Sequence, residues 1–166
     1  MSKFQSKRIS REYKQINAGQ PDKVFPLLCP VRESEWLPHF KAKVIYSSTG
    51  ISEDGAIFQT THGDDVPITW IITRYNPNSL IEMIYIIPNI RIVRINIQLV
   101  NHDKEHTETT IMYTQTGLTE RGNAEVEKFT EERFNHQMEF WEKAINFYLI
   151  HGKMISSDEH YIPSHK

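Results

Sequence analysis

Alternating apolar and polar residues dominate the chain as far as residue 116. The alternation is most regular over residues 90–100, and a period of two is typical of a strand with one dry and one wet face. On this pattern seven strands are predicted, over residues 9–16, 42–48, 56–62, 66–75, 80–87, 90–100 and 107–116. Short turns connect the last six of them, which favours antiparallel neighbours.

The apolar spacing becomes helical near the C-terminus. Residues 123–151 carry a broad apolar stripe and are predicted to form one long helix of about 45 Å. Asn123 is its predicted N-cap, and Gly152 fits a C-terminal stop. The stripe consists of Val126, Phe129, Phe134, Met138, Trp141, Ile145, Tyr148 and Leu149.

Prolines mark a shorter helical region after the first strand. Pro21 suits the first position of a short helix over residues 21–28. Pro26 is expected to kink this helix and Pro30 to end it. A second helical turn is predicted over residues 34–40, so that a short helix pair follows the first strand.

Two of the predicted strands carry further information. In the strand at residues 66–75 one face is more apolar than the other. Arg74 is predicted to lie on this more apolar face, because side chains alternate with a period of two. The strand at residues 80–87 is apolar on both faces, which suits cover from both sides, and a homodimer contact is one explanation. The apolar face of the strand at residues 66–75 consists of Val66, Ile68, Trp70 and Ile72.

Length and composition limit the class of protein. The 166 residues suit a single domain, predicted over residues 1–152 with a flexible tail at 153–166. No apolar run reaches the roughly 18 residues of a membrane-spanning helix, and the net charge of −2 gives no general attraction to nucleic acid. We therefore expect no nucleic-acid partner and no stable membrane insertion. A single cysteine, Cys29, and the lack of a signal peptide predict a cytoplasmic location.

Three stretches of sequence carry a resemblance to a known family. They are CPVRE at residues 29–33 with WLP at 36–38, TWIITRYNP at 69–77, and TGLTERGN at 116–123. With the order of elements, they resemble the START-like (SRPBCC) superfamily, and the first stretch resembles a bacterial branch whose members mostly lack an assigned activity. The resemblance implies an α+β helix-grip fold, in which a curved antiparallel seven-stranded sheet wraps around a long C-terminal helix.

Aromatic side chains suit the wall of a ligand cavity between that sheet and that helix. Each ring buries a large area, and a tyrosine hydroxyl can orient a polar group. Ordinary core packing is the alternative for each of them. The candidates are Trp36, Trp70, Tyr85, Tyr113, Phe134, Trp141 and Tyr148.

Charged residues are candidates for the mouth of the cavity. Arg32 and Glu33 would hold the polar head of a ligand there, and a structural salt bridge that pins the helix pair to the sheet is the alternative. Arg74 offers the same choice. Cys29 could be a nucleophile, which needs a nearby base, and His39 is the candidate base close to it in sequence. We interpret Cys29 instead as a buried small residue.

The histidines do not predict a metal site. His102 and His106 fall in one turn with Asp103 and Glu105, and His62 falls in another with Asp64 and Asp65. Neither group has the spacing on a rigid element that zinc sites use. We expect no metal and no cofactor.

Three functions fit this outline. The first is binding of a hydrophobic small molecule, such as a lipid, sterol, quinone or polyketide, for carriage or sensing. The second is a polyketide cyclase or aromatase-like enzyme that uses the same cavity, with Glu33, Tyr85 and Tyr113 as acid or base candidates. The third is a protein-binding module like the chaperone activators of the superfamily, which would need an exposed apolar patch. No catalytic signature motif is present, so binding is preferred over catalysis.

Overall fold

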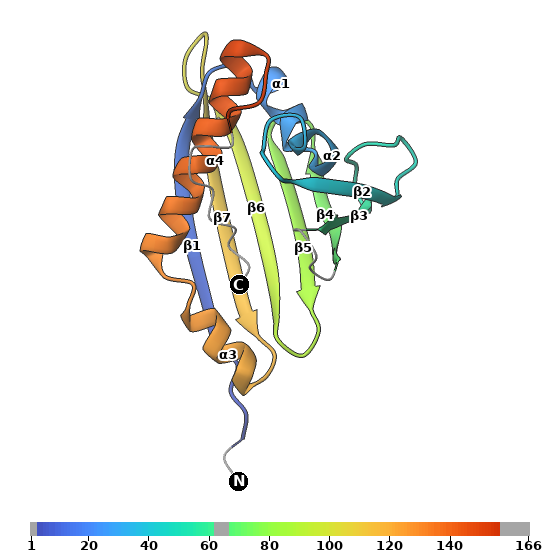
Figure 1. The fold of residues 1–166 in the computed structure, drawn as a ribbon, viewed down its shortest axis with the longest axis vertical. Coiled ribbons are helices and arrows are strands. Elements are labelled where there is room, and N and C mark those ends of the chain that lie inside the picture. Colours follow the sequence, from blue (N-terminus) through green and yellow to red (C-terminus); the bar gives the residue numbers. More distant parts are fainter. Residues whose placement is uncertain (1–2, 62–66, 157–166) are drawn as a thin grey trace.

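The computed structural model describes residues 3–61 and 67–156 and shows one antiparallel seven-stranded sheet (Figure 1). Its strand order is β1-β7-β6-β5-β4-β3-β2, so every strand except the first lies beside its neighbour in sequence. The predicted strands are confirmed, although His62 and Val66 lie outside the described residues. Their bounds are β1 Arg8–Asn17, β2 Lys41–Tyr46, β3 Ile57–Thr61, β4 Ile68–Asn76, β5 Leu80–Ile87, β6 Arg91–Asn101 and β7 Thr107–Gly117.

The alternation along β6 places one face of the sheet in the core. Its apolar residues are nearly inaccessible to solvent, whereas Arg94 on the other face is exposed. On β5 the inward residues are also buried, but Ile86 on the outer face is 53% exposed. A homodimer contact at that face therefore stays a prediction. The buried residues of β6 are Val93, Ile95, Ile97 and Leu99.

A β-bulge in β4 changes which residues face the core. The register with β5 shifts between Ile72 and Arg74, so the regular alternation is broken there. Tyr75 packs against the core, with its ring centroid 5.3 Å from that of Phe25, and Arg74 is exposed. The prediction that Arg74 shares the face of Trp70 is wrong for this reason.

Three short helical segments follow β1: α1 (Pro21–Val24), η1 (Phe25–Leu28) and α2 (Pro30–Glu33). The predicted change near Pro26 is confirmed, because the helix tightens there into a 3-10 turn. The helical region ends at Leu28, as predicted, because Cys29 before Pro30 is extended. Pro30 also begins α2, since it occupies the first helical position, where no N–H is needed. Residues 34–40 form turns instead of the predicted helical turn.

The predicted single C-terminal helix is two helices, α3 (Glu120–Glu127) and α4 (Glu131–His151). Each helix has its own N-cap, because the side chain of Thr119 accepts a hydrogen bond from Gly122 N and that of Thr130 accepts one from Arg133 N. Asn123 is therefore not the cap. Gly152 is the C-cap of α4 with φ of 67°, as predicted.

Asn123 instead ties α3 to the N-terminal segment. Its Oδ1 accepts from Lys7 N at 2.8 Å, and its Nδ2 donates to Gln5 O at 2.9 Å. Gly122 lies against the carbonyl of Ile90 so closely that a Cβ would be 1.8 Å from that oxygen. The Gly122-Asn123 pair thus serves the packing of α3 on the sheet.

Helix α4 lies over one face of the sheet along β1 and β7, with α3 beyond its N-terminal end (Figure 1). Hydrogen bonds fix it to β1, because Glu142 accepts from Tyr13 Oη and from Ile16 N. After α4 the chain returns to the core, where Ile155 is 5% exposed. Residues 157–166 lie outside the described residues, so the domain limits and the flexible tail stay predictions. No helix in the described ranges is long and apolar enough to cross a membrane.

Candidate functional site

An apolar pocket lies between the sheet and α4, beside α2. Its volume, counted as the space that the centre of a water molecule can occupy, is about 80 Å³. Its wall is formed by side chains from α2 and the following turn, from the sheet and from α4. The lining residues are Pro30, Glu33, Leu37, Phe40, Thr60, Trp70, Met83, Ile95, Ile97, Ile111, Tyr113, Gln137, Met138, Phe140 and Trp141.

Glu33 is the one residue of this lining that carries a carboxyl group. No hydrogen bond or ion pair to this carboxyl is formed by any residue within 3–61 or 67–156, and the residue, which is intermediate in exposure, lines the pocket. Burial among apolar neighbours raises the pKa of Glu33 to about 8. At neutral pH the group is therefore mostly a protonated acid, which can both donate and accept a hydrogen bond.

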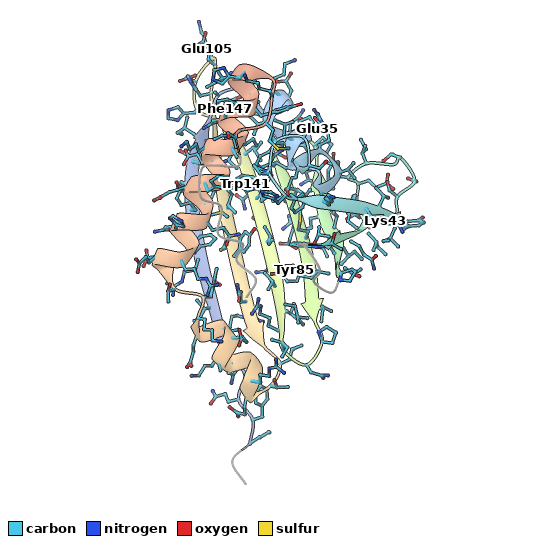
Figure 2. All side chains as sticks on the ribbon, in the orientation of Figure 1. Glu35, Lys43, Tyr85, Glu105, Trp141 and Phe147 are labelled. Carbon is cyan, nitrogen blue, oxygen red and sulfur yellow. The ribbon has the colours of Figure 1, made fainter. Side chains whose placement is uncertain are left out.

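Trp70 is held in place at the sheet side of the pocket. Its Nε1 donates to Thr60 Oγ1 at 2.8 Å, and its ring lies 4.2 Å from that of Tyr85, centroid to centroid. On the helix side, Trp141 extends from α4 toward the helix pair, as Figure 2 shows. One indole from the sheet and one from α4 thus line the apolar space.

A second hollow adjoins the first and shares Trp70, Tyr113 and Gln137 with it. Its volume, counted in the same way, is about 60 Å³, and it lies at the junction of α3 and α4. Its lining is much more polar than that of the first pocket. The remaining residues around it are Tyr85, Arg91, Gln115, Glu125, Lys128, Phe129, Arg133 and Phe134.

Arg91 reaches this second hollow from the first residue of β6. Its side chain is only 12% exposed, and one guanidinium nitrogen lies 4.0 Å from Glu125 Oε2. Its Nε is buried, with no hydrogen-bond partner among the residues that the structure describes. Burial raises the pKa of the Tyr85 hydroxyl to about 12, and the neighbouring Arg91 partly opposes that rise.

Glu125 keeps its charge at this end of the site. Lys128 Nζ donates to its Oε1 at 2.8 Å, and this bond is the main reason why the pKa of Glu125 is lowered. Glu125 therefore interacts more closely with Lys128 than with Arg91. The guanidinium of Arg91 is left only partly neutralised.

Six of the ten predicted site residues line the two hollows. Glu33 and Trp141 line the first, Tyr85 and Phe134 line the second, and Trp70 and Tyr113 line both. Four do not line either one: Arg32, Trp36, Arg74 and Tyr148. Trp36 is fully buried in the core, where its Nε1 donates to Leu27 O.

Arg32 is paired with Glu35 and not with its neighbour Glu33. Arg32 forms a bidentate pair with Glu35, in which both N···O distances are 3.1 Å, and Tyr148 Oη donates to Glu35 at 2.8 Å. Adjacent residues of a helix point in different directions, whereas residues three apart share a face. Arg32 and Glu35 therefore meet at the surface, and Glu33 is left to face the pocket.

Several lining residues were not singled out from the sequence. Arg91 precedes Val93 by two positions, so the period of two already placed it on the inner face of β6. Gln115 follows Tyr113 by two on β7, and Gln137 follows Phe134 by three on α4. The signal for each was its register with an aromatic or apolar residue already predicted to face inward.

Two minor candidates stay outside the site. Cys29 is buried at 5% exposure and does not line either hollow. His106 Nδ1 lies 2.9 Å from Asp103 Oδ1 in an exposed turn. Within the described ranges, no three residues of the types His, Cys, Asp and Glu are grouped as a metal site would need.

Comparison with solved structures identifies the fold. A solution structure of a protein from Arthrobacter aurescens has a TM-score of 0.65 at 15% identity, over 92% of this chain and 93% of that one. Norcoclaurine synthase from Thalictrum flavum, in complex with dopamine and hydroxybenzaldehyde, has a TM-score of 0.63 at 13% identity, over 89% and 90%. The crystal structure of Ara h 8.0201 has a TM-score of 0.61 at 15% identity, over 87% and 99%.

No protein-family model matches the sequence, and no curated protein matches it. The structural likeness nevertheless covers almost the whole of each chain. The protein has the helix-grip fold that the sequence resemblance implied, and its membership of the START-like (SRPBCC) superfamily stays a prediction. Its assignment to a particular bacterial branch stays a prediction.

Proposed function

We propose that this protein binds a hydrophobic small molecule in the pocket between the sheet and α4, for carriage or sensing. The helix-grip fold commonly binds hydrophobic ligands. The observation that carries the proposal is the carboxyl of Glu33, which faces an apolar space without a partner among the described residues. A ligand with an apolar body and one hydroxyl or carbonyl would satisfy this group while burying its own surface.

Burial of apolar surface would supply most of the affinity, at about 25 cal/mol per Å² before the costs of association. The aromatic rings on both walls suit flat or chain-like molecules such as sterols, quinones, acyl chains or polyketides. Glu33 would then select among them by hydrogen bonding, because an unmade hydrogen bond in a buried site is costly.

Displacement of a fluorescent dye tests the proposal directly. Purified protein would be titrated with 1-anilinonaphthalene-8-sulfonate and then with one member of each of those four classes. Gln137→Trp places a bulky ring between the two hollows and is expected to weaken dye and ligand binding at least tenfold. His136→Trp is the matched control, since His136 is the neighbouring exposed residue of α4. Equal binding by the two variants would contradict the proposal.

Catalysis by Glu33 is a second candidate function, favoured by its raised pKa. An acid with a pKa of about 8 can take and give protons near neutral pH, which is what a cyclase or aromatase-like reaction needs. Glu33→Gln keeps the shape of the side chain and removes the exchangeable proton. Turnover of a polyketide-like substrate that survives this substitution would exclude Glu33 as the catalytic acid or base.

A further inference from the structure

We propose that the second hollow is an oxyanion subsite, which holds the anionic head group of an amphiphilic ligand whose apolar body lies in the first pocket. This inference rests on the proposed function and adds to it the chemical class and the orientation of the ligand. Four features of the described residues support it.

The first feature is the charge around the hollow. Three cationic side chains line it, those of Arg91, Lys128 and Arg133, against one carboxylate, that of Glu125. Glu125 is engaged mainly by Lys128, at 2.8 Å. An anion placed here would meet an excess of positive charge in a partly desolvated space, where such attraction is strong.

The second feature is the position of Arg91. The side chain is nearly buried and its guanidinium is hydrogen-bonded to the Tyr85 side chain, but its Nε has no partner within the described ranges, and the 4.0 Å to Glu125 Oε2 is too long for a hydrogen bond. A buried donor without an acceptor is costly. A guanidinium fork matches two oxygens of a carboxylate or phosphate, which would satisfy this donor.

The third feature is the continuity of the two hollows. Trp70, Tyr113 and Gln137 line both of them, so the apolar space and the cationic one adjoin at these three side chains. In this proposal one ligand passes these side chains, with its head group beside Arg91 and its apolar body in the first pocket.

The fourth feature fixes the direction of the ligand. Glu33 lies in the first pocket and is absent from the lining of the second, whereas all three cationic groups are in the second. A carboxylate or phosphate beside Glu33 would lack a positive partner and would oppose ionisation of that acid. The anionic end is thus expected at the α3–α4 junction and the apolar end beneath α2.

Three ligands with the same ten-carbon chain test the inference by dye displacement at pH 7.5. Decanoate and decyl phosphate carry the two kinds of oxyanion head group, and 1-decanol carries none. The wild-type protein is expected to bind at least one of the two anions about tenfold or more tightly than the alcohol. The advantage of an anion is its affinity divided by that of 1-decanol, and the anion with the larger advantage identifies the head group that the subsite binds.

Arg91→Gln is expected to abolish that advantage and to leave binding of 1-decanol nearly unchanged. Arg94→Gln is the matched control, because Arg94 lies on the same strand but on the exposed face, and it should retain the full advantage. If Arg91→Gln does not fold, as judged by circular dichroism, Arg133→Gln provides the same test at the surface of α4, with a smaller expected loss. The guanidinium of Arg133 forms no hydrogen bond or ion pair with a residue of the described ranges that its substitution would break.

The outcomes separate this inference from the proposed function. If 1-decanol displaces the dye but neither anion binds more tightly than the alcohol, the oxyanion subsite is refuted and the hydrophobic pocket remains. Equal losses for all three ligands in Arg91→Gln would also refute it. If none of the three displaces the dye, the proposed function itself fails, because binding of the alcohol requires only the apolar pocket.

Discussion

The indole of Trp36 meets that of Trp141 edge to face, with ring centroids 5.0 Å apart and ring planes at 75°. This contact joins the turn after α2 to the middle of α4. Trp36 is fully buried and anchored by its hydrogen bond to Leu27 O, whereas Trp141 also lines the apolar pocket. One wall of the pocket is therefore supported directly by the core.

Removal of the Trp36 ring is expected to destabilise the whole protein. Trp36→Ala should lower the free energy of unfolding by about 3–5 kcal/mol, because a large cavity replaces a fully buried ring. Urea denaturation followed by circular dichroism measures the change. Tyr46→Ala is the control, since Tyr46 is 62% exposed on the edge strand β2 and its loss should change stability by less than about 0.5 kcal/mol. Similar losses for both variants would contradict the role of Trp36 in the core.

Two tyrosines that donate to glutamates are expected to differ in importance. Tyr13 Oη donates to Glu142 at 2.7 Å in a partly buried contact that joins β1 to α4, and the hydroxyl of Tyr148 donates to Glu35 at the surface. Tyr13→Phe should lower the free energy of unfolding by about 1–2 kcal/mol, and Tyr148→Phe by less than about 1 kcal/mol. Urea denaturation of the two variants side by side provides the comparison. A larger loss of unfolding free energy for Tyr148→Phe would contradict this ranking and would show that the Arg32–Glu35–Tyr148 cluster contributes more to stability than the Tyr13–Glu142 hydrogen bond.

The stability of the protein should fall with rising pH because of Glu33. Its pKa in the folded state is about 8, and the ordinary value of 4.5 applies to the unfolded chain. Between these two values the folded state binds more protons, so the free energy of unfolding decreases as the pH rises from about 4.5 to 8. From pH 5 to pH 9 the loss attributable to Glu33 should be about 2 kcal/mol, less than the full shift implies because the residue is not fully shielded from solvent.

Glu33→Gln isolates this effect. The amide has nearly the same shape and does not ionise, so the variant should lack this part of the decrease and should exceed the wild type in stability at pH 9. Urea denaturation at several pH values between 5 and 9 gives the difference between the two proteins. Glu35→Gln is the control on the exposed side of the same segment and should not reproduce the pattern. Parallel pH profiles for Glu33→Gln and the wild type would contradict the assigned burial of Glu33.

The close packing of α3 on the sheet predicts a strong effect at Gly122. A Cβ at this position would lie 1.8 Å from the carbonyl oxygen of Ile90, so Gly122→Ala must displace α3. The expected loss is about 2 kcal/mol or more in the free energy of unfolding, as for other overpacked sites. Gly19→Ala is the matched control, because the nearest atom to its Cβ would lie at 3.4 Å. Thermal unfolding of both variants compares them, and equal melting temperatures would contradict this account of Gly122.

The strands were predictable because their signal is local. Alternation along β6 depends only on the period of two, and the structure confirms it from Val93 to Leu99. The bulge in β4 was not predictable in the same way, because it is a property of the pairing with β5. Arg74 was misplaced by that single extra residue.

The division of the C-terminal helix was missed for a different reason. Apolar residues continue at near-helical spacing through the break, since Phe129 between the helices is itself nearly buried at 9% exposure. The sequence did hold a signal, because Thr130 is followed by Glu131 and Glu132, which is typical of a helix start. The same pattern of threonine followed by glutamate begins α3 at Thr119.

The candidate site was only half predictable. Aromatic residues were sensible choices for a wall, but Trp36 and Trp141 look alike in sequence, and only packing in three dimensions decides which of them faces a hollow. Glu33 was identified together with Arg32 for its place near Trp36, but Arg32 is paired with Glu35 at the surface. Glu33 is the last residue of the four-residue helix α2, and the direction of its side chain depends on how Pro30 starts that helix.

The interruption at residues 128–130 has a consequence for how ligand preference can change. Since α3 and α4 are capped separately, a substitution or insertion in the junction does not have to propagate along the longer helix. The junction borders the cationic hollow through Lys128 and Phe129, whereas the apolar hollow is bordered by the middle of α4. A change in the sequence of this junction can therefore alter the lining of the cationic hollow while the apolar hollow keeps its walls.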